Sequence, residues 1–310
     1  MKESNRYRGR FAPSPTGPLH FGSLVAALAG CLEARTHGGQ WLVRMEDVDE
    51  PRCSADAAVG ILRTLERLGF AWDDEVMVQS RRKERYRELL ETLKADRLAY
   101  PCACTRRELA DSALAGDGAA IYPGTCRDGL PAGKAARAWR LKVGDAAAGF
   151  DDELQGRVSQ RLGEEVGDFV LLRADGYFAY QLAVVADDAD QGITHVVRGA
   201  DLLDSTPRQI FLQSCLGLPA PAYAHLPVAV NAAGEKLSKQ TRALAVDSLD
   251  SASVLSAALR FLGQAPPAGL PDVAAVWAWA AEHWRLERVP RVRALPSSPA
   301  WRQGSGGEIV

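Results

Sequence analysis

The sequence predicts an α/β fold built on a doubly wound parallel sheet. Segments of strand-like apolar character alternate with segments whose apolar residues recur at helical spacing, and this alternation favours parallel strands covered by helices. The first strand runs into a loop rich in proline and glycine and then a helix, an arrangement that can present backbone N–H groups to an anion. A hydrophobic content of 47% in 310 residues is sufficient for a substantial core.

The first hundred residues contain two predicted strands and three predicted helices. The first helix carries an apolar stripe with Leu24, Leu28 and Leu32 and stops at the double glycine of Gly38 and Gly39. The other helices follow from the same spacing rule. The predicted boundaries are residues 7–12 and 40–45 for the strands, and residues 19–37, 55–68 and 81–96 for the helices.

Strand and helix signals continue in the second half of the chain. Asp204 and Ser205 offer a helix N-cap ahead of Pro207, so a helix is expected to run to about Cys215 and to end at Gly217. The remaining expectations are strands over residues 138–143 and 169–173, a surface loop over 111–120, a return toward the first sheet over 177–185, helices beyond 247, and a poorly ordered tail over about the last twenty residues.

The charge balance predicts no global attraction to nucleic acid. The 37 Lys and Arg residues are matched by 39 Asp and Glu residues, so the formal net charge is −2 and any nucleic-acid contact has to be local. Mixed-sign clusters at residues 81–87 and 285–293 are, taken alone, typical of solvated surfaces. The polar N-terminus and the lack of a run of about 18 apolar residues predict a soluble, cytoplasmic protein with no membrane partner. We expect it to be a monomer.

Two segments far apart in the sequence carry groups suited to a bound triphosphate. His20, Gly22 and Ser23 open the first helix, where backbone N–H groups favour an anion and glycine permits close approach of a flat group such as adenine. Far downstream, Lys236 and Lys239 flank a serine in a glycine-led loop that could neutralise phosphate charge. Each segment alone is typical of an ordinary turn or solvated loop. Their combination predicts a nucleotide site.

The same two segments resemble the signature motifs of a known enzyme family. The stretch RFAPSPTGPLHFGS, residues 10–23, resembles the HIGH motif of glutamyl-type class I aminoacyl-tRNA synthetases, and KLSKQ, residues 236–240, resembles their KMSKS loop. The departures from those motifs are Phe21 for isoleucine, Ser23 for the second histidine, Leu237 for methionine and Gln240 for the final serine.

This resemblance implies a Rossmann-type catalytic domain and a role for each motif residue. His20, Lys236 and Lys239 would stabilise charge on the phosphates, and ATP would contact His20, Gly22, Ser23 and Lys239 together with Mg²⁺. The loss of the second histidine affects the rate more than the reaction type, because the reaction depends on positioning and electrostatics.

A pocket for glutamate needs at least one guanidinium and one acidic group, because the substrate has two carboxylates and one ammonium. Arg10 and Glu46 both follow predicted parallel strands, where open α/β sheets bind ligands. The resemblance implies a pocket lined by Arg10, Phe11, Ala12, Pro13, Ser14, Glu46, Tyr180 and Arg198.

Three cysteines and a tyrosine fall within one short window. Cys102, Cys104, Tyr122 and Cys126 offer three thiolates and a phenol, a plausible tetrahedral zinc set, although buried free cysteines are the alternative on chemistry alone. This spacing resembles the zinc site of the glutamyl-queuosine tRNA(Asp) synthetases, which implies one structural Zn²⁺. Tyr122 is the ligand that a water molecule could replace.

The length of the chain bears on which branch of the family it resembles. Only 70 residues follow Gln240, which is too few for the anticodon-binding domain of a full glutamyl-tRNA synthetase. Resemblance to the glutamyl-queuosine tRNA(Asp) synthetases implies that L-glutamate is activated with ATP without tRNA and transferred to the queuosine base in the anticodon stem-loop of tRNA(Asp). The alternatives are a truncated glutamyl- or glutaminyl-tRNA synthetase that charges the tRNA 3′ end, and a non-catalytic tRNA-binding paralogue.

These expectations divide the chain into four parts, the second of which would also form an acceptor-binding-like subdomain. They are the first half of the nucleotide-binding domain at residues 1–100, the zinc-containing insertion at 101–168, the second half with the KMSKS-like loop at 169–247, and a short helical C-terminal region with a disordered tail at 248–310.

Overall fold

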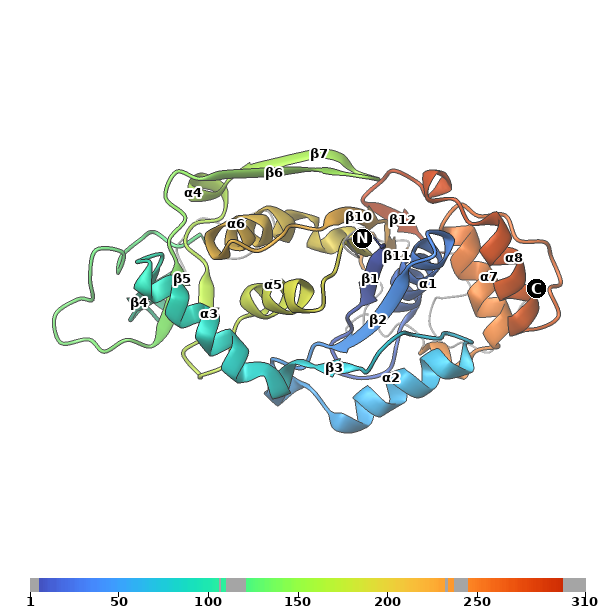
Figure 1. Ribbon diagram of the computed structural model, residues 1–310, viewed down its shortest axis with the longest axis horizontal. Helices are drawn as coiled ribbons and strands as arrows, with labels where there is room; N and C mark the ends of the chain where they lie inside the picture. The colour runs from blue at the N-terminus through green and yellow to red at the C-terminus, as the bar shows by residue number, and fades with distance from the viewer. Residues whose placement is uncertain (1–5, 106, 110–120, 232–233, 237–244, 298–310) are drawn as a thin grey trace.

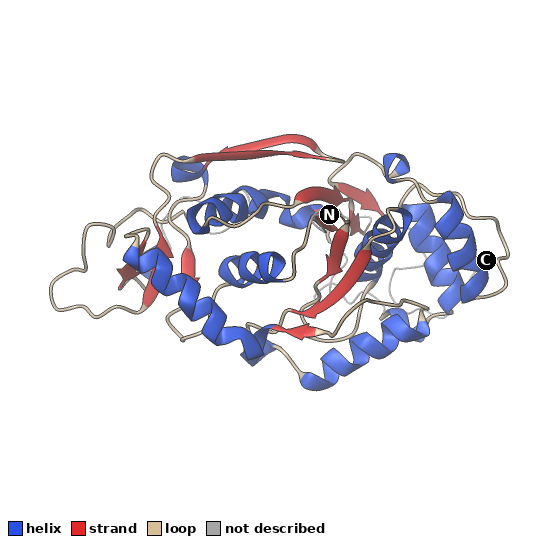
Figure 2. Cartoon of the chain, in the orientation of Figure 1, coloured by secondary structure: helices blue, strands red, loops and turns tan. Residues whose placement is uncertain are grey.

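Parallel strands form the centre of the molecule (Figures 1 and 2). β1 pairs with β2, β2 with β3, and β9 with β10, all in parallel. The Thr194 amide donates a hydrogen bond to the Arg8 carbonyl, which brings β9 beside β1 and gives the order β3-β2-β1-β9-β10. The strand bounds are β1 Arg8–Phe11, β2 Gln40–Met45, β3 Met77–Val78, β9 His195–Gly199 and β10 Ala222–Leu226.

The computed structural model describes residues 6–105, 107–109, 121–231, 234–236 and 245–297. Within these ranges no helix is long and apolar enough to cross a membrane. The predicted surface loop at 111–120 and the predicted disordered tail lie wholly or mostly outside them. Short 3₁₀ helices occur at Glu50–Arg52, Gln79–Arg82, Arg107–Leu109, Ala200–Ser205, Val246–Ser248 and Leu286–Arg288.

The helix α1 (Phe21–Thr36) joins the parallel strands to the C-terminal helices. Its side chains Leu24, Leu28 and Leu32 are almost completely buried, and it contacts β1, β2 and β9. On its other side it packs against α7 (Ser251–Phe261) and α8 (Val273–His283), which lie at one end of the elongated molecule (Figure 1). The amphipathic α2 (Ala55–Arg67) buries Ile61 and Leu65 in the same core.

A second core lies toward the other end of the molecule (Figure 1). There an antiparallel sheet in the order β4-β5-β8 is packed with helices whose buried side chains include Tyr86, Leu90, Leu182 and Leu212. The bounds are α3 Lys83–Ala95, β4 Ala99–Cys102, β5 Ala138–Leu141, α4 Leu162–Glu165, β8 Val170–Leu172, α5 Tyr180–Asp190 and α6 Thr206–Leu216.

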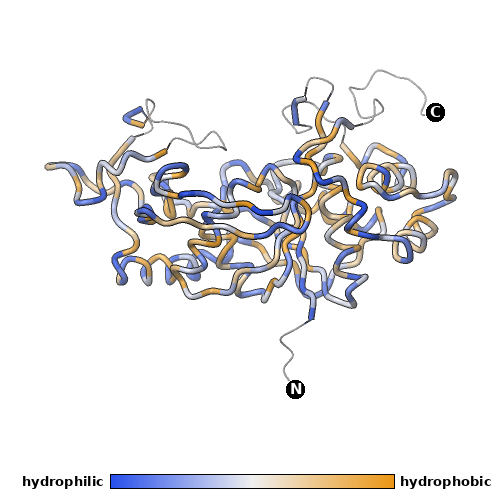
Figure 3. Tube along the Cα trace, turned by 90° about the horizontal axis from the view of Figure 1, so that it is seen from above, coloured by the Kyte–Doolittle hydropathy of each residue, from blue (hydrophilic) through white to orange (hydrophobic). Residues whose placement is uncertain are grey.

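A long hairpin covers one side of the molecule and contacts α6 and β10. It consists of β6 (Ala147–Asp152) and β7 (Gly156–Arg161), and it crosses the front of the view from above (Figure 3). Along β7 the half-buried Val158 and Gln160 alternate with exposed residues, as expected for a strand with one exposed face and one covering face. The remaining pair is β11 (Val228–Val230) with β12 (Ala294–Pro296).

Most predicted elements of the first half are confirmed to within a few residues, and so is the helix that ends at Gly217 with a left-handed conformation. Residues 177–185, for which a return toward the first sheet was expected without a stated element, run into helix α5, and the strand that follows, β9, lies beside β1.

Candidate active site

A cleft of about 740 Å³ opens at the carboxyl ends of the parallel strands. Residues 12–18 directly follow β1, Glu46 directly follows β2, and Pro227 directly follows β10, and all of them line it except Pro15. Open parallel sheets bind ligands at this edge, because the loops that leave the strands converge there. Strand topology alone therefore identifies this cleft as the candidate active site.

The cleft brings together every predicted ATP and glutamate residue that the structure describes. Those residues are Arg10, Phe11, Ala12, Pro13, Ser14, His20, Gly22, Ser23, Glu46, Tyr180, Arg198 and Lys236. Lys239 lies outside the described residues. Lys236 and His20, more than two hundred positions apart in the sequence, line one cleft, as the nucleotide-site prediction requires.

His20 caps the N-terminus of α1. The Ser23 amide donates to His20 Nδ1 at 3.2 Å, so in the neutral ring Nε2 carries the proton, and Ser23 Oγ lies 3.1 Å from Nε2. An added Cβ at Gly22 would lie 3.3 Å from Nδ1, so the imidazole lies against the backbone there. The first turn of α1 contains no acidic residue, which leaves the positive end of the helix dipole available to an anion.

Both flanks of residues 237–244 lie at the cleft. On one side Lys236 pairs with Val230 of β11, and its Nζ lies 2.6 Å from Asp201 Oδ2. On the other side Ala245 forms a bridge with His20, and the Val246 amide donates to the Leu19 carbonyl. The described residues on either side of this stretch, Lys236 and Ala245, therefore both lie close to residues that line the cleft.

Four buried charges connect β1 and β2 to α5. Arg10 Nε and Arg44 Nη2 donate to the same oxygen of Asp188, at 3.0 and 2.7 Å, and Arg44 also donates to Glu46 at 3.2 Å. Burial raises the pKa of Glu46, against the opposing effect of the two arginines. Burial also acts to raise the pKa of Asp188, but Arg10 and Arg44 outweigh it and the net shift is downward.

Arg198 is held differently, by uncharged acceptors. Its Nε donates to His225 Nε2 at 3.0 Å, and its Nη2 donates to Thr206 Oγ1 at 2.7 Å and to Gln209 Oε1 at 2.8 Å. Its Nη1 lies 3.5 Å from the hydroxyl of Tyr180, another residue that lines the cleft. Burial and the nearby Glu46 raise the pKa of Tyr180, so its hydroxyl stays neutral.

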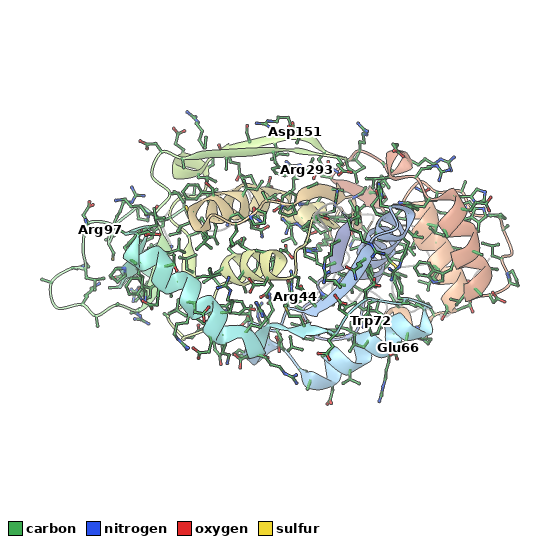
Figure 4. All side chains as sticks on the ribbon, viewed as in Figure 1. Arg44, Glu66, Trp72, Arg97, Asp151 and Arg293 are labelled. Carbon is green, nitrogen blue, oxygen red and sulfur yellow. The ribbon has the colours of Figure 1, made fainter. Side chains whose placement is uncertain are left out.

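Sequence reasoning missed the residues that support this pocket. Asp188 comes just after the apolar run of residues 182–186 in α5, next to Asp187, and His225 lies in an apolar strand. Charged or polar residues at such positions are a usable signal. Asp152 offered no such signal, because it lies in a hairpin that was not predicted. Arg44, labelled in Figure 4, is a residue of β2 whose guanidinium reaches Asp188 of α5.

The cysteine window forms a second, separate cluster. The sulfur atoms of Cys102, Cys104 and Cys126 all lie within 4.8 Å of one another, with Cys104 and Cys126 at 3.7 Å. The Tyr122 hydroxyl lies 3.5 Å from the sulfurs of both Cys102 and Cys104. A sulfur separation of 3.7 Å is far longer than a disulfide bond, and four donor atoms around one centre could hold a metal ion.

Comparison with known proteins agrees with this geometry. Residues 6–263 match the family model described as "tRNA synthetases class I (E and Q), catalytic domain". The chain belongs to this family. It therefore has the α/β fold of a class I tRNA synthetase catalytic domain and is an enzyme of the ligase type, and the predicted resemblance is confirmed.

Several relatives within this family are similar over nearly the whole chain. A protein of Dechloromonas aromatica (strain RCB) named glutamyl-Q tRNA(Asp) synthetase is 65% identical over 92% of this chain and 96% of its own length. Proteins with the same name from Aromatoleum aromaticum (strain DSM 19018 / LMG 30748 / EbN1) and Thiobacillus denitrificans (strain ATCC 25259 / T1) are 60% and 57% identical, each over more than 90% of both chains.

Solved structures match the same fold. A glutamate tRNA ligase from Elizabethkingia meningosepticum CCUG26117, determined in complex with its amino acid, superposes with a TM-score of 0.76 at 26% identity and covers 96% of this chain and 68% of its own. The glutamate-tRNA synthetase from Elizabethkingia anophelis gives a TM-score of 0.77 at 24% identity and supports the fold alone.

The buried charge cluster leads to a stability prediction. The variant Asp188→Asn removes the carboxylate that Arg10 and Arg44 share, so we expect a loss of about 3–5 kcal/mol in the free energy of unfolding. Asp190→Asn is the matched control, because Asp190 pairs with arginines at the partly exposed end of the same helix and should lose no more than about 1 kcal/mol. Denaturant unfolding measures both, and equal losses would contradict the prediction.

Proposed function

We propose that this chain activates L-glutamate with ATP, without tRNA, and transfers the glutamyl group to the queuosine base in the anticodon of tRNA(Asp). The observation that carries the first half is the shared cleft, which combines the N-terminus of α1, His20 and Lys236 with the arginines of a pocket for a carboxylate substrate. The names of the closely similar relatives support the second half.

In the proposed activation step, an oxygen of the glutamate α-carboxylate attacks the α-phosphorus of ATP. The bond between the α-phosphorus and the bridging oxygen breaks, and glutamyl-adenylate and pyrophosphate form. His20 Nε2 and the backbone N–H groups at the start of α1 would donate to phosphate oxygens, with Gly22 and Ser23 beside the nucleotide. Lys236 and Lys239 would supply positive charge, and class I synthetases use ATP with Mg²⁺.

Arg198 and Arg10 would have different roles in the proposed glutamate pocket. Arg198 has no carboxylate of the described residues within 4.0 Å and faces Tyr180, so its charge is suited to a substrate carboxylate. Arg10 already pairs with Asp188 and would shape the pocket together with Glu46 and the backbone of residues 11–14. In the transfer step, a hydroxyl of the queuosine cis-diol would attack the glutamyl carbonyl carbon, form an ester and release AMP.

The activation half is tested by pyrophosphate exchange. We expect exchange of labelled pyrophosphate into ATP with glutamate but not with glutamine or aspartate, and the rate should not depend on tRNA. Lys239→Ala should lower this rate by at least about tenfold, because it removes a positive charge that would stabilise the phosphates of ATP during adenylyl transfer. The exposed Lys142, which does not line the cleft, provides the control Lys142→Ala. An enzyme with no glutamate-dependent exchange would contradict the proposal.

The proposed transfer to queuosine is tested with an acceptor RNA that has no tRNA 3′ end. We expect labelled glutamate to be transferred to an anticodon stem-loop of tRNA(Asp) that contains queuosine, and not to the same stem-loop with guanosine in its place. Charging of full-length tRNA that persists with guanosine, together with an inert queuosine stem-loop, would instead identify a synthetase that charges the 3′ end.

We further propose that the cysteine cluster holds one structural Zn²⁺. In a tetrahedral site with Zn–S bonds of about 2.3 Å, sulfur atoms lie about 3.8 Å apart and a phenolate oxygen about 3.5 Å from each sulfur. The separations of 3.7 Å between Cys104 and Cys126 and of 3.5 Å from Tyr122 to Cys102 and Cys104 fit these values. A bound ion would connect β4 to the segment around Cys126.

Elemental analysis of the purified protein tests this zinc site. We expect close to one zinc per chain in the wild type and a large loss in Cys104→Ser, because one of three thiolate ligands is removed. Cys215→Ser is the control, since Cys215 lies on α6 away from the cluster and should leave the zinc content unchanged. Full zinc occupancy in Cys104→Ser would refute the ligand set.

A further inference from the structure

A chain of buried hydrogen bonds runs from the β6–β7 hairpin to Arg198. Asp152, the last residue of β6, and His225 of β10 both have fully buried side chains, and Asp152 Oδ2 lies 2.6 Å from His225 Nδ1. On the other side of the ring, Nε2 accepts the hydrogen bond from Arg198 Nε at 3.0 Å. The imidazole therefore connects the hairpin directly to a guanidinium of the cleft.

The partners of His225 determine its protonation. Arg198 Nε can only donate, so His225 Nε2 must be the unprotonated acceptor, and Nδ1 must carry the proton that it donates to Asp152. The pKa values agree, because burial lowers that of His225 to about 4. Burial also acts to raise the pKa of Asp152, but the hydrogen bond from His225 helps to bring it below its usual range. A neutral ring thus lies between an anion and a cation.

The Asp152 carboxylate is itself fixed. Its second oxygen, Oδ1, accepts hydrogen bonds from the backbone amides of Leu154, Gln155 and His225, at 3.0, 2.8 and 3.2 Å. These donors belong to the hairpin turn and to β10, so the carboxylate cannot rotate without breaking them. Oδ2 is consequently held toward the imidazole.

Arg198 is therefore held in place without a carboxylate of the described residues within 4.0 Å of its guanidinium. Its acceptors His225, Thr206 and Gln209 are all neutral, and together they engage Nε and both protons of Nη2. This leaves the Nη1 edge, beside Tyr180, directed at the cleft. Arg10, by contrast, is already paired with the Asp188 carboxylate.

We propose that Asp152 and His225 are positioning residues that keep Arg198 oriented, and its charge available, for the carboxylate of the amino-acid substrate. This inference rests on the proposed activation of glutamate. Neither residue lines the cleft, so both act through Arg198. A purely structural role, in which the pair only attaches the hairpin to β10, is the alternative that the experiment has to separate.

Asp152→Asn is the decisive variant. Oδ1 of the new amide would keep the three backbone donors, so its NH₂ group would face His225 Nδ1 and the ring would have to move its proton to Nε2. That proton would face Arg198 Nε–H and, at 3.1 Å, Thr206 Oγ1, so whether it opposes Arg198 or turns to the threonine, Arg198 loses the acceptor of its Nε proton. We expect the KM for glutamate in pyrophosphate exchange to rise about tenfold or more, with the KM for ATP nearly unchanged.

Two substitutions of His225 provide a second test, which examines the contact of Nε2 with Arg198 and the contact of Nδ1 with Asp152 separately. A glutamine side chain can present its terminal group near the position of Nε2, and an asparagine near that of Nδ1. His225→Gln should therefore retain an acceptor for Arg198 and raise the KM for glutamate less than His225→Asn, which retains only the contact to Asp152. Equal values for the two variants would support a structural role alone.

Asp151→Asn is the matched control. Asp151 precedes Asp152 on the same strand, but its side chain is 80% exposed and lies at the outer edge of the hairpin, where it is labelled in Figure 4. We expect wild-type KM values for both substrates. A rise equal to that of Asp152→Asn would show that any change in the hairpin disturbs the site.

Nitrogen NMR of histidine-labelled protein gives a readout that does not depend on activity. The chain has only five histidines, and the wild-type His225 should show a protonated Nδ1, which moves to Nε2 in Asp152→Asn. An unchanged proton position, or an unchanged glutamate KM, would overturn the inference. Absence of glutamate-dependent exchange in the wild type would instead refute the proposed function and leave the NMR prediction standing.

Discussion

The cleft depends on one buried carboxylate, that of Asp188, which connects strands β1 and β2 to helix α5. It accepts hydrogen bonds from Arg10 at β1 and Arg44 at β2, and it comes from α5, an element of the second core. Buried guanidinium groups are tolerated only when they are paired, so this one side chain permits two arginines to lie beneath a ligand site. The positions of the loops after β1 and β2 follow from that arrangement.

The arginines at the cleft differ in whether an acidic residue neutralises their charge. Arg10 and Arg44 are neutralised by acidic partners, whereas Arg198 is held by an imidazole, a hydroxyl and an amide. A pocket in which every cation is already neutralised would bind a carboxylate weakly, and a pocket of unpaired cations would be unstable. The observed division would satisfy both requirements for the proposed carboxylate substrate.

The fold class and the two nucleotide-binding segments could be predicted because they depend on local signals, whereas Tyr180 and Arg198 were expected only from the family resemblance. Strand and helix alternation, the Pro/Gly loop before His20 and the lysine loop at Lys236 are each contiguous in the chain. The partners of these residues are not contiguous: Asp188 and Arg10 are 178 positions apart, and His225 and Asp152 are 73 apart. No periodicity encodes such contacts. The hairpin also escaped prediction, because its strands mix glycine and charged residues with apolar ones.

The β6–β7 hairpin lies on the outside of the molecule, yet Asp152, the last residue of β6, is buried against β10. Binding of the proposed amino-acid substrate would then depend on residues that never touch it. Screens for altered selectivity that vary only the residues lining the cleft would miss the supporting residues of the hairpin and β10. A library directed at the hairpin and β10 would sample them.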